Sequence, residues 1–233
     1  MKINFAPFSV ADVIGFVTDP HLSFTFSQEG EDLLLEELFQ DKAGAPGFYV
    51  DVGAHHPKRF SNTYCFYMRG WTGINIDATP GSMAAFREQR PKDINLELGI
   101  GADEAELTFF LFGEPALNTF DAERAAFLES STAFRIADRQ SVPVRRLATV
   151  LAEHAGDRAI DFLSVDTEGF DLAVVKSNDW ERFRPRIVLL EDLATDLLAL
   201  AETDLCRFML SQDYRPIVKL PRSVIYRDGR VTS

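Results

Sequence analysis

The chain of 233 residues has few cysteines and no long apolar run. Its two cysteines, Cys65 and Cys206, show neither a CxxC motif nor the spacing of a zinc site. A disulfide framework is therefore not expected, and a reducing compartment fits. No stretch reaches the ~20 apolar residues that a membrane span needs, and the N-terminal sequence MKINFAPFSVADVIGF lacks the features of a signal peptide. We expect a soluble, cytoplasmic protein with no membrane span.

Positive charge is also scarce. The chain has 24 lysines and arginines against 36 aspartates and glutamates, so its formal net charge is −12. Nucleic acid is an extended polyanion, and proteins that bind it need a basic surface. The chain as a whole lacks such a surface, although Arg145 and Arg146 could form a local cluster. The composition argues against nucleic acid as a partner. It is compatible with assembly of the chain into a homo-oligomer.

Short apolar runs alternate with stretches of helical character. A turn with polar residues or glycine follows each run, and strand and helix in alternation predict an α/β fold with a mostly parallel sheet and helices on both faces. The tail has two β-rich runs around Pro221, which predict a closing antiparallel hairpin. The expected strands lie in residues 47–54, 73–78, 93–101, 160–171 and 185–193, and the expected helices in 81–90, 122–139, 147–156, 172–183 and 194–212.

The pattern predicts one domain over residues 27–233, preceded by a lead-in, residues 1–26, that packs on it and holds a short helix near Ser9 to Val17. Residues 27–40 predict a helix with Ser27 as its N-cap. The segment 107–144 is too long for a simple connection. Because ligands of open α/β sheets bind outside the carboxyl ends of the strands, we expect this insertion to form a substrate wall.

Carboxylates follow the ends of the predicted strands. Because the carboxyl ends of parallel strands share one edge of the sheet, these acids should converge on one crevice. Asp77 suits a pair of ribose hydroxyls, since one carboxylate can accept two hydrogen bonds. The alternative is that Asp51 and Asp77 only cap the helices that follow them. The strand-end acids are Asp51, Asp77, Asp166, Glu191 and Asp192.

The glycine-rich fingerprint of dinucleotide-binding proteins, G-x-G-x-x-G, is absent. After Gly53 the next glycine is Gly70, which argues against a nicotinamide oxidoreductase. Asp51, two residues before Gly53, would also place negative charge beside a pyrophosphate. A cofactor without phosphates and with a positively charged amino-acid portion tolerates acids better. S-adenosylmethionine has a sulfonium, an ammonium, a ribose and an adenine, and it fits this pattern.

Six segments together resemble the FkbM family of S-adenosylmethionine-dependent methyltransferases. They are SQEGED, FYVDVGAHHPKRFSNTY, GWTGINIDATPGS, DINLELGIG, EPALNTF and IDFLSVDTEGFDLAVV, in the family's order, within about residues 27–191. The resemblance implies the class I methyltransferase (Rossmann-like) fold, a seven-stranded sheet whose last strand is antiparallel. It also implies O-methylation of a hydroxyl, often on a sugar or a natural product.

The resemblance implies roles for individual residues. His55 stands where many members have asparagine and Pro57 where they have glycine, so the first loop is stiffer and carries two imidazoles, His55 and His56. These two alone are not expected to form a metal site. The residues expected at the cofactor are Asp51, Gly53, Ala54 and His55 in the first loop, Asn62 and Thr63 near the methionine end, Asp77 and Ala78 at the ribose and adenine, Gly99 and Ile100 at the adenine edge, and Asp166, Glu168 and Gly169 of the D-x-E-G signature on the reactive edge.

Methyl transfer to a hydroxyl needs help in removing its proton, and two routes are open. In one, His55, His56 or Glu168 is the general base, with Asp166 also among the catalytic groups. In the other, three carboxylates on two adjacent strand ends bind Mg²⁺, which prefers oxygen ligands. The expected metal ligands are Asp166, Glu191 and Asp192. Alternatively, Glu191 and Asp192 only cap the next helix.

The acceptor is expected to be a small molecule or a glycan that contacts the segment EPALNTF. Asn118 and Thr119 could bind a polyol and Phe120 could stack on a sugar, or the segment is an ordinary loop that Phe120 packs. An N-methyltransferase of a small molecule and a non-catalytic binding module with the same fold are the alternative functions.

Overall fold

The computed structural model describes residues 15, 18–19, 21–42 and 44–230. The helix predicted near Ser9 to Val17 falls on residues that, apart from Gly15, lie outside this range. Among the described residues, no helix has the length and apolar character to cross a membrane.

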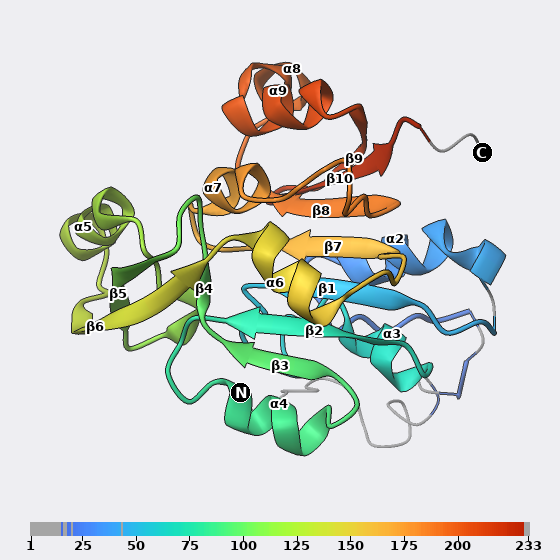
Figure 1. Ribbon diagram of the computed structural model, residues 1–233, viewed down its shortest axis with the longest axis horizontal. Helices are drawn as coiled ribbons and strands as arrows, with labels where there is room; N and C mark the ends of the chain where they lie inside the picture. The colour runs from blue at the N-terminus through green and yellow to red at the C-terminus, as the bar shows by residue number, and fades with distance from the viewer. Residues whose placement is uncertain (1–14, 16–17, 20, 43, 231–233) are drawn as a thin grey trace.

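Seven strands form the central sheet in the order β3-β2-β1-β7-β8-β10-β9 (Figure 1). Neighbours from β3 to β8 pair in parallel, whereas β10 is antiparallel to both β8 and β9. The predicted α/β fold, with a mostly parallel sheet and an antiparallel C-terminal hairpin, is confirmed. The strands are β1 (Phe48–Val52), β2 (Thr72–Asp77), β3 (Ile94–Glu97), β7 (Phe162–Val165), β8 (Ile187–Glu191), β9 (Tyr214–Lys219) and β10 (Ser223–Asp228).

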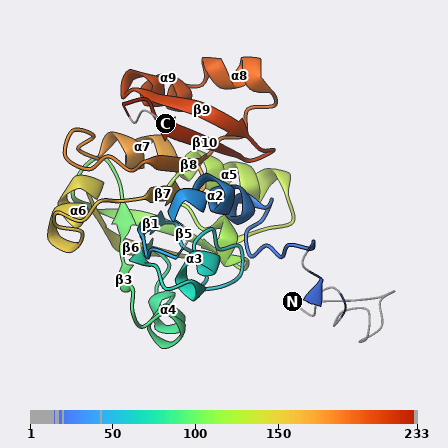
Figure 2. The ribbon, with the colours of Figure 1, turned by 90° about the vertical axis from the view of Figure 1, so that its right-hand side faces the viewer.

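Helices cover both faces of this sheet, as Figure 2 shows nearly edge-on. One face packs Leu147 and Val150 of α6 and Val174 of α7 into the larger core cluster. The opposite face packs Leu35 of α2 and Phe66 of α3. Covered strands need apolar side chains on both faces, which explains their nearly continuous apolar runs. The helices are α2 (Glu31–Leu38), η1 (Gln40–Lys42), α3 (Tyr64–Met68), α4 (Met83–Gln89), α6 (Leu147–His154), α7 (Asp171–Lys176), α8 (Leu197–Glu202) and α9 (Asp204–Ser211).

The long segment after β3 forms a second, three-stranded sheet in the order β4-β6-β5. Figure 1 shows this sheet, with β4 and β5 in green and β6 in yellow, beside the carboxyl ends of the parallel strands. The run 93–101, which predicted one strand, therefore divides between two sheets at Leu98. The elements are β4 (Gly99–Ile100), β5 (Ala105–Phe112), η2 (Pro115–Leu117), α5 (Ala122–Ser131) and β6 (Ile136–Arg145).

Two local predictions are wrong. Helical character was predicted over 122–139, but α5 ends at Ser131 and the chain continues as β6, antiparallel to β5. Pairing with a distant strand overrides the local helix propensity there. Ser27 is not the N-cap of α2, because Gly30 takes that position with φ 87°. The Ser27 hydroxyl instead donates a 2.8 Å hydrogen bond to Asp32.

Candidate functional site

A cleft lies at the carboxyl edge of the central sheet, between the loops after β1, β2 and β7 and the three-stranded sheet. Four of the five predicted strand-end acids face it, together with Glu168. The arrangement brings together residues that are more than 100 positions apart in the sequence. The polar lining includes Asp51, Asp77, Asp166, Glu168 and Glu191, and the apolar lining includes Ile76, Leu98, Ile100, Phe109 and Phe120.

The loop after β1 makes close contact with the loop after β7 at Gly53. A Cβ atom at Gly53 would lie 1.7 Å from the backbone oxygen of Asp166, and Gly53 has φ 83°. The Asp-x-Gly spacing was expected to permit approach of a cofactor. The structure gives a further reason, because any side chain at Gly53 would push the two loops apart.

His55 lines the cleft in a left-handed backbone conformation, with φ 53°. Histidine and asparagine are among the non-glycine residues enriched there, so a histidine can take the position where the resemblance leads one to expect asparagine. Its ring Nε2 lies 2.9 Å from the Arg59 guanidinium. Since arginine only donates, Nε2 is an acceptor and its lone pair is engaged. Burial, and then the charge of Arg59, lower the pKa of His55.

His56 serves the turn instead. Its Nδ1 accepts hydrogen bonds of 3.0 Å from the backbone N–H groups of Lys58 and Arg59, and its side chain is not part of the cleft lining. Burial, followed by the charge of Arg59, lowers the pKa of His56. Of the two adjacent imidazoles, His55 is therefore the one that faces the cleft.

Asp77, the predicted ribose acid, is held by two backbone N–H groups. His55 donates to Oδ2 and Thr79 donates to Oδ1, each at 2.7 Å. The next helix, α4, begins after Ser82, so Asp77 does not cap it. A carboxylate has about four lone-pair positions, which leaves Asp77 able to accept two further bonds from the cleft side. Ala78 also lines the cleft.

Asp51 forms a buried group with the segment that follows the turn His55-His56-Pro57. The Thr63 hydroxyl donates to Asp51 Oδ2 at 2.9 Å, and Asn62 donates to Ser164 at 3.1 Å. Asn62 lines the cleft, whereas Thr63 is fully buried behind Asp51. Thr63, expected beside the cofactor, therefore acts on the cleft through Asp51. Burial raises the pKa of Asp51, and the charge of Arg90 opposes this.

The EPALNTF segment, residues 114–120, forms hydrogen bonds that connect the three-stranded sheet to the loops after β2 and β7. Asn118 donates to the Thr79 hydroxyl at 3.1 Å and accepts from the backbone of Phe112. The Thr119 hydroxyl donates to the Glu168 carbonyl at 2.9 Å. Thr119 is fully buried, whereas Asn118 is buried but still lines the cleft. These contacts favour the interpretation of this segment as a packed loop.

The predicted adenine edge is formed by Gly99 and Ile100, which line the cleft beside Phe120. A Cβ atom at Gly99 would come within 2.6 Å of the Phe120 ring. That ring packs 4.5 Å from Phe109 and 5.7 Å from Phe170, centroid to centroid. Phe120 therefore belongs to the apolar wall near Gly99.

Asp166, Glu168 and Glu191 form a cluster in which one carboxylate oxygen from each lies within 4.8 Å of the others. Asp166 is open to water through the cleft, yet protein atoms surround it closely. Burial, and then Glu191 and Glu168, raise the pKa of Asp166 well above its usual range. Burial and Glu168 raise the pKa of Glu191 to about 8. Burial also raises the pKa of Glu168, although its ion pair with Arg124 of α5 opposes the shift.

The third predicted metal ligand, Asp192, faces elsewhere. Its carboxylate accepts hydrogen bonds of 2.9 Å from the Ala194 backbone and from the Thr203 hydroxyl. The structure brings Glu168 to the cluster instead, because Glu168 has a left-handed backbone conformation, φ 53°, in the turn after β7. The D-x-E spacing in the sequence is the signal that could have pointed to this set.

Sequence reasoning also missed three charged residues near the cleft. Arg124 and Arg90 lie in segments with no motif, so only the fold brings them close. Asp171 follows the D-x-E-G signature and accepts hydrogen bonds from the backbone and hydroxyl of Thr167. Burial, and then Asp166, raise the pKa of Asp171 to about 7.

Comparison with models of known protein families shows to which family the chain belongs. The sequence profile described as Methyltransferase FkbM domain matches residues 51–216, which is most of the chain. The chain belongs to the FkbM methyltransferase family. The resemblance to this family of methyltransferases is thereby confirmed.

More distant similarities add little. No curated protein matches the chain significantly. A structure described as methyltransferase FkbM from Methylobacillus flagellatus KT shares 15% identity, with a TM-score of 0.46, over 79% of this chain and 44% of that one. Monomeric WbdD shares 15% identity, with a TM-score of 0.45, over 91% of this chain and 44% of that one. The chain thus covers less than half of either protein, and these scores carry no argument about function.

Proposed function

We propose that this FkbM methyltransferase transfers a methyl group from S-adenosylmethionine to a hydroxyl of a sugar, a glycan or a glycosylated natural product. The observation that carries the proposal is the carboxylate cluster of Asp166, Glu168 and Glu191 in the cleft, beside the loop predicted to bind the cofactor. A hydroxyl is a weak nucleophile, and a cluster of acids can take up its proton directly or through a bound cation.

The residues around the cleft fit the parts of S-adenosylmethionine. Asp51 offers a buried carboxylate for the ammonium group, and Asp77 is fixed in position to accept hydrogen bonds from two ribose hydroxyls. Leu98, Ile100 and Phe120 offer an apolar wall for the adenine. When bound, the cofactor supplies an electrophilic methyl group, and holding the acceptor oxygen in line with it provides much of the rate.

The candidate bases differ in availability. His56 bonds to its own turn, and the Nε2 lone pair of His55 is engaged by Arg59. Glu168 faces the cleft, although Arg124 pairs with it. Among the three predicted bases, we therefore favour Glu168, with Asp166 beside it in the same cluster.

The same cluster supports a role for Mg²⁺. Three carboxylates with mutual repulsion and raised pKa values gain stability from a hard cation that accepts oxygen ligands. Asp166, Glu168 and Glu191 would hold the ion, in place of the predicted set with Asp192. An ion there would lower the pKa of the acceptor hydroxyl. A cytoplasmic location is also part of the proposal, supported by Cys65 and Cys206, which are buried and unpaired.

One observation favours a second candidate. A carboxylate cluster also attracts a cationic amine, so N-methylation of a small amine remains an alternative. An amine acceptor becomes nucleophilic by losing its own proton and does not require a strong base.

The proposal is tested by methyl transfer from labelled S-adenosylmethionine to matched acceptors, a panel of sugars and glycosides against their amino-sugar counterparts. Hydroxyl acceptors should be methylated, with activity reduced by a chelator if the cation takes part. Methylation confined to the amines would overturn the O-methyltransferase proposal. Calorimetric titration with S-adenosylhomocysteine, with Mg²⁺ and with a chelator, verifies beforehand that the purified protein binds the cofactor product.

A further inference from the structure

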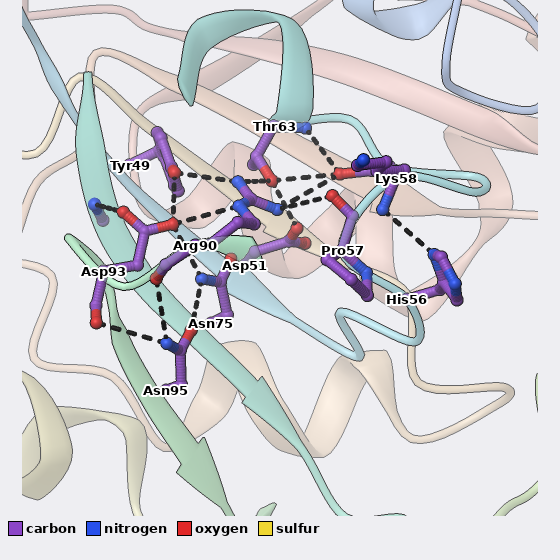
Figure 3. Close-up of polar contacts among 12 residues, drawn as sticks. Tyr49, Asp51, His56, Pro57, Lys58, Thr63, Asn75, Arg90, Asp93 and Asn95 are labelled. Carbon is purple, nitrogen blue, oxygen red and sulfur yellow. Dashed lines mark hydrogen bonds and ion pairs between the residues drawn. The ribbon is translucent and has the colours of Figure 1, made fainter. Parts of the chain in front are cut away.

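Arg90 lies at the C-terminal end of α4, and its side chain is 0% exposed. Figure 3 shows its guanidinium at the centre of a polar network that reaches from β1 to the loop after it. The rings of Tyr49, Tyr67 and Phe86 lie 5.3–5.6 Å from its central carbon atom. A fully buried arginine is rare and costly unless its charge and its N–H groups are satisfied.

One side of the guanidinium contacts the scaffold. Its Nε lies 3.1 Å from Asp93 Oδ2 in an ion pair, and an NH2 group donates to the Tyr49 hydroxyl at 2.8 Å. Tyr49 in turn donates to Asp93 at 2.6 Å. A buried ion pair of this kind often contributes no more to stability than apolar residues of similar volume. The ion pair by itself is therefore weak evidence that Arg90 serves stability alone.

The guanidinium also holds the loop after β1, in part through the same Nη2 that donates to Tyr49. It donates to the Thr63 hydroxyl at 2.8 Å and makes longer bonds to the Ser61 hydroxyl, 3.4 Å, and the Pro57 carbonyl, 3.5 Å. Thr63 then donates to Asp51 at 2.9 Å. Because arginine can only donate, the Thr63 oxygen accepts from Arg90 and its hydrogen is directed to Asp51. The two hydrogen bonds therefore run in a fixed order of donor and acceptor, from Arg90 to Thr63 and from Thr63 to Asp51.

We propose that Arg90 is a positioning residue for the methionine end of S-adenosylmethionine: through Thr63 it fixes the Asp51 carboxylate, and through Pro57 and Ser61 it fixes the loop around it. This inference rests on the proposed placement of the cofactor ammonium at Asp51. Arg90 is buried beneath the loop and does not touch the cofactor. Asp77 at the ribose is held instead by the backbone N–H groups of His55 and Thr79.

Charge supports the same role. Asp51 is buried, and Asp77 and Asp166 act on it with the same sign of charge. Arg90 is the positive charge that favours its ionised form, assisted by hydrogen bonds from Thr63 and Ser164. An ionised Asp51 is the form that attracts an ammonium group.

The test removes the hydrogen bonds that link Arg90 to Asp51 by substituting Thr63, because substitution of Arg90 itself could unfold the protein. Thr63→Val keeps the shape but removes the hydroxyl, and Thr63→Ser is the matched control that retains it. Thr63 makes no side-chain cap to α3, so the helix loses no cap in either variant. Each protein is titrated calorimetrically with S-adenosylhomocysteine and with 5′-methylthioadenosine, which keeps adenine, ribose and sulfur but lacks the amino-acid group.

Thr63→Val should weaken S-adenosylhomocysteine binding roughly tenfold, the size of one lost hydrogen bond to a charged group. Its affinity for 5′-methylthioadenosine should stay within about twofold, and Thr63→Ser should restore both values. A structural role alone would weaken the two ligands equally. Equal loss for both ligands, or no loss for either, would overturn the proposal.

Asp51→Asn separates this inference from the cofactor placement. If Asp51→Asn weakens S-adenosylhomocysteine but not 5′-methylthioadenosine, Asp51 binds the amino-acid portion, and Thr63→Val then decides the role of Arg90. If Asp51→Asn leaves the difference between the two ligands unchanged, the placement at Asp51 itself is wrong, and the role of Arg90 falls with it. Arg90→Lys keeps the charge but loses the paired donors. If this variant folds, its affinities for the two ligands should match those of Thr63→Val.

Discussion

The two halves of the cleft hold acids in opposite ways. On the β1–β2 side, Asp51 and Asp77 each accept hydrogen bonds from the protein, and Arg90 lies behind the loop. On the β7–β8 side, Asp166 and Glu191 face like charges, and Arg124 pairs with their neighbour Glu168. The carboxylates of the first half already have hydrogen-bond partners in the protein. The carboxylates of the second half repel each other, so binding a proton or a cation stabilises them.

This difference suggests a division of labour. A carboxylate that is already hydrogen-bonded does not reorganise when a ligand arrives, which suits the tight and repeated binding of one cofactor. On the other side the pKa values of the carboxylates are raised, that of Glu191 to about 8, which suits a reaction that removes a proton from an acceptor. The predictions below test whether the two halves are as separate as their contacts imply.

The largest expected effect is on catalysis, from the β7–β8 side. Glu168→Gln should lower kcat/KM roughly 10²–10⁴-fold, the range for loss of a general base, with little change in S-adenosylhomocysteine affinity. His56→Ala is the control and should stay within about twofold, because His56 only caps its turn. Normal activity of Glu168→Gln with the enzyme's acceptor would favour the amine alternative.

The next effect is on cofactor binding, from the β1–β2 side. Asp77→Ala should weaken S-adenosylhomocysteine roughly 100-fold, because two hydrogen bonds to a charged group are lost. Calorimetry measures the affinity, and circular dichroism checks that the variant is folded. Unchanged affinity would contradict the placement of the ribose at Asp77.

A smaller effect concerns stability against pH. The pKa of Glu191 is about 8 in the folded protein, against an ordinary value of 4.5. The folded state therefore keeps a proton that the unfolded chain releases, and the contribution of this side chain to stability falls as pH rises from about 4.5 to 8.

Glu191→Gln should therefore match the native protein near pH 4 and exceed its stability at pH 8 by on the order of 2 kcal/mol. Thermal unfolding at the two pH values measures this. Mg²⁺ should raise the Tm of the native protein at pH 8 and have less effect on the variant. A variant that is less stable at pH 8 would show that Glu191 is not destabilised by its neighbours.

The smallest effect is expected at Asp192, outside the cluster. Asp192→Ala loses hydrogen bonds to Ala194 and Thr203, which should cost about 1 kcal/mol of stability. Its response to Mg²⁺ should equal that of the native protein, as measured by the shift in Tm. A lost Mg²⁺ response would return Asp192 to the metal site and weaken the contrast between the two halves.

The sequence by itself determined the sheet and much of the cleft. Buried parallel strands must be apolar on both faces, so runs such as 48–52 stand out, and the acids after them must share one edge. Asp77 and Asp166 could be placed in the cleft on that argument alone. Gly53 was also recognisable as special, although its contact with the Asp166 carbonyl was not.

Only the tertiary structure decided which side chains complete each half. Glu168 joins the cluster and Asp192 leaves it because a turn with φ 53° directs one inward and hydrogen bonds hold the other away. Arg90, just past the end of α4, and Arg124 of α5 contact Thr63 and Glu168 at the two halves of the cleft, although no local pattern marks them. Such contacts depend on how distant segments pack against each other, and that information is not contained in the spacing of residues along one strand or helix.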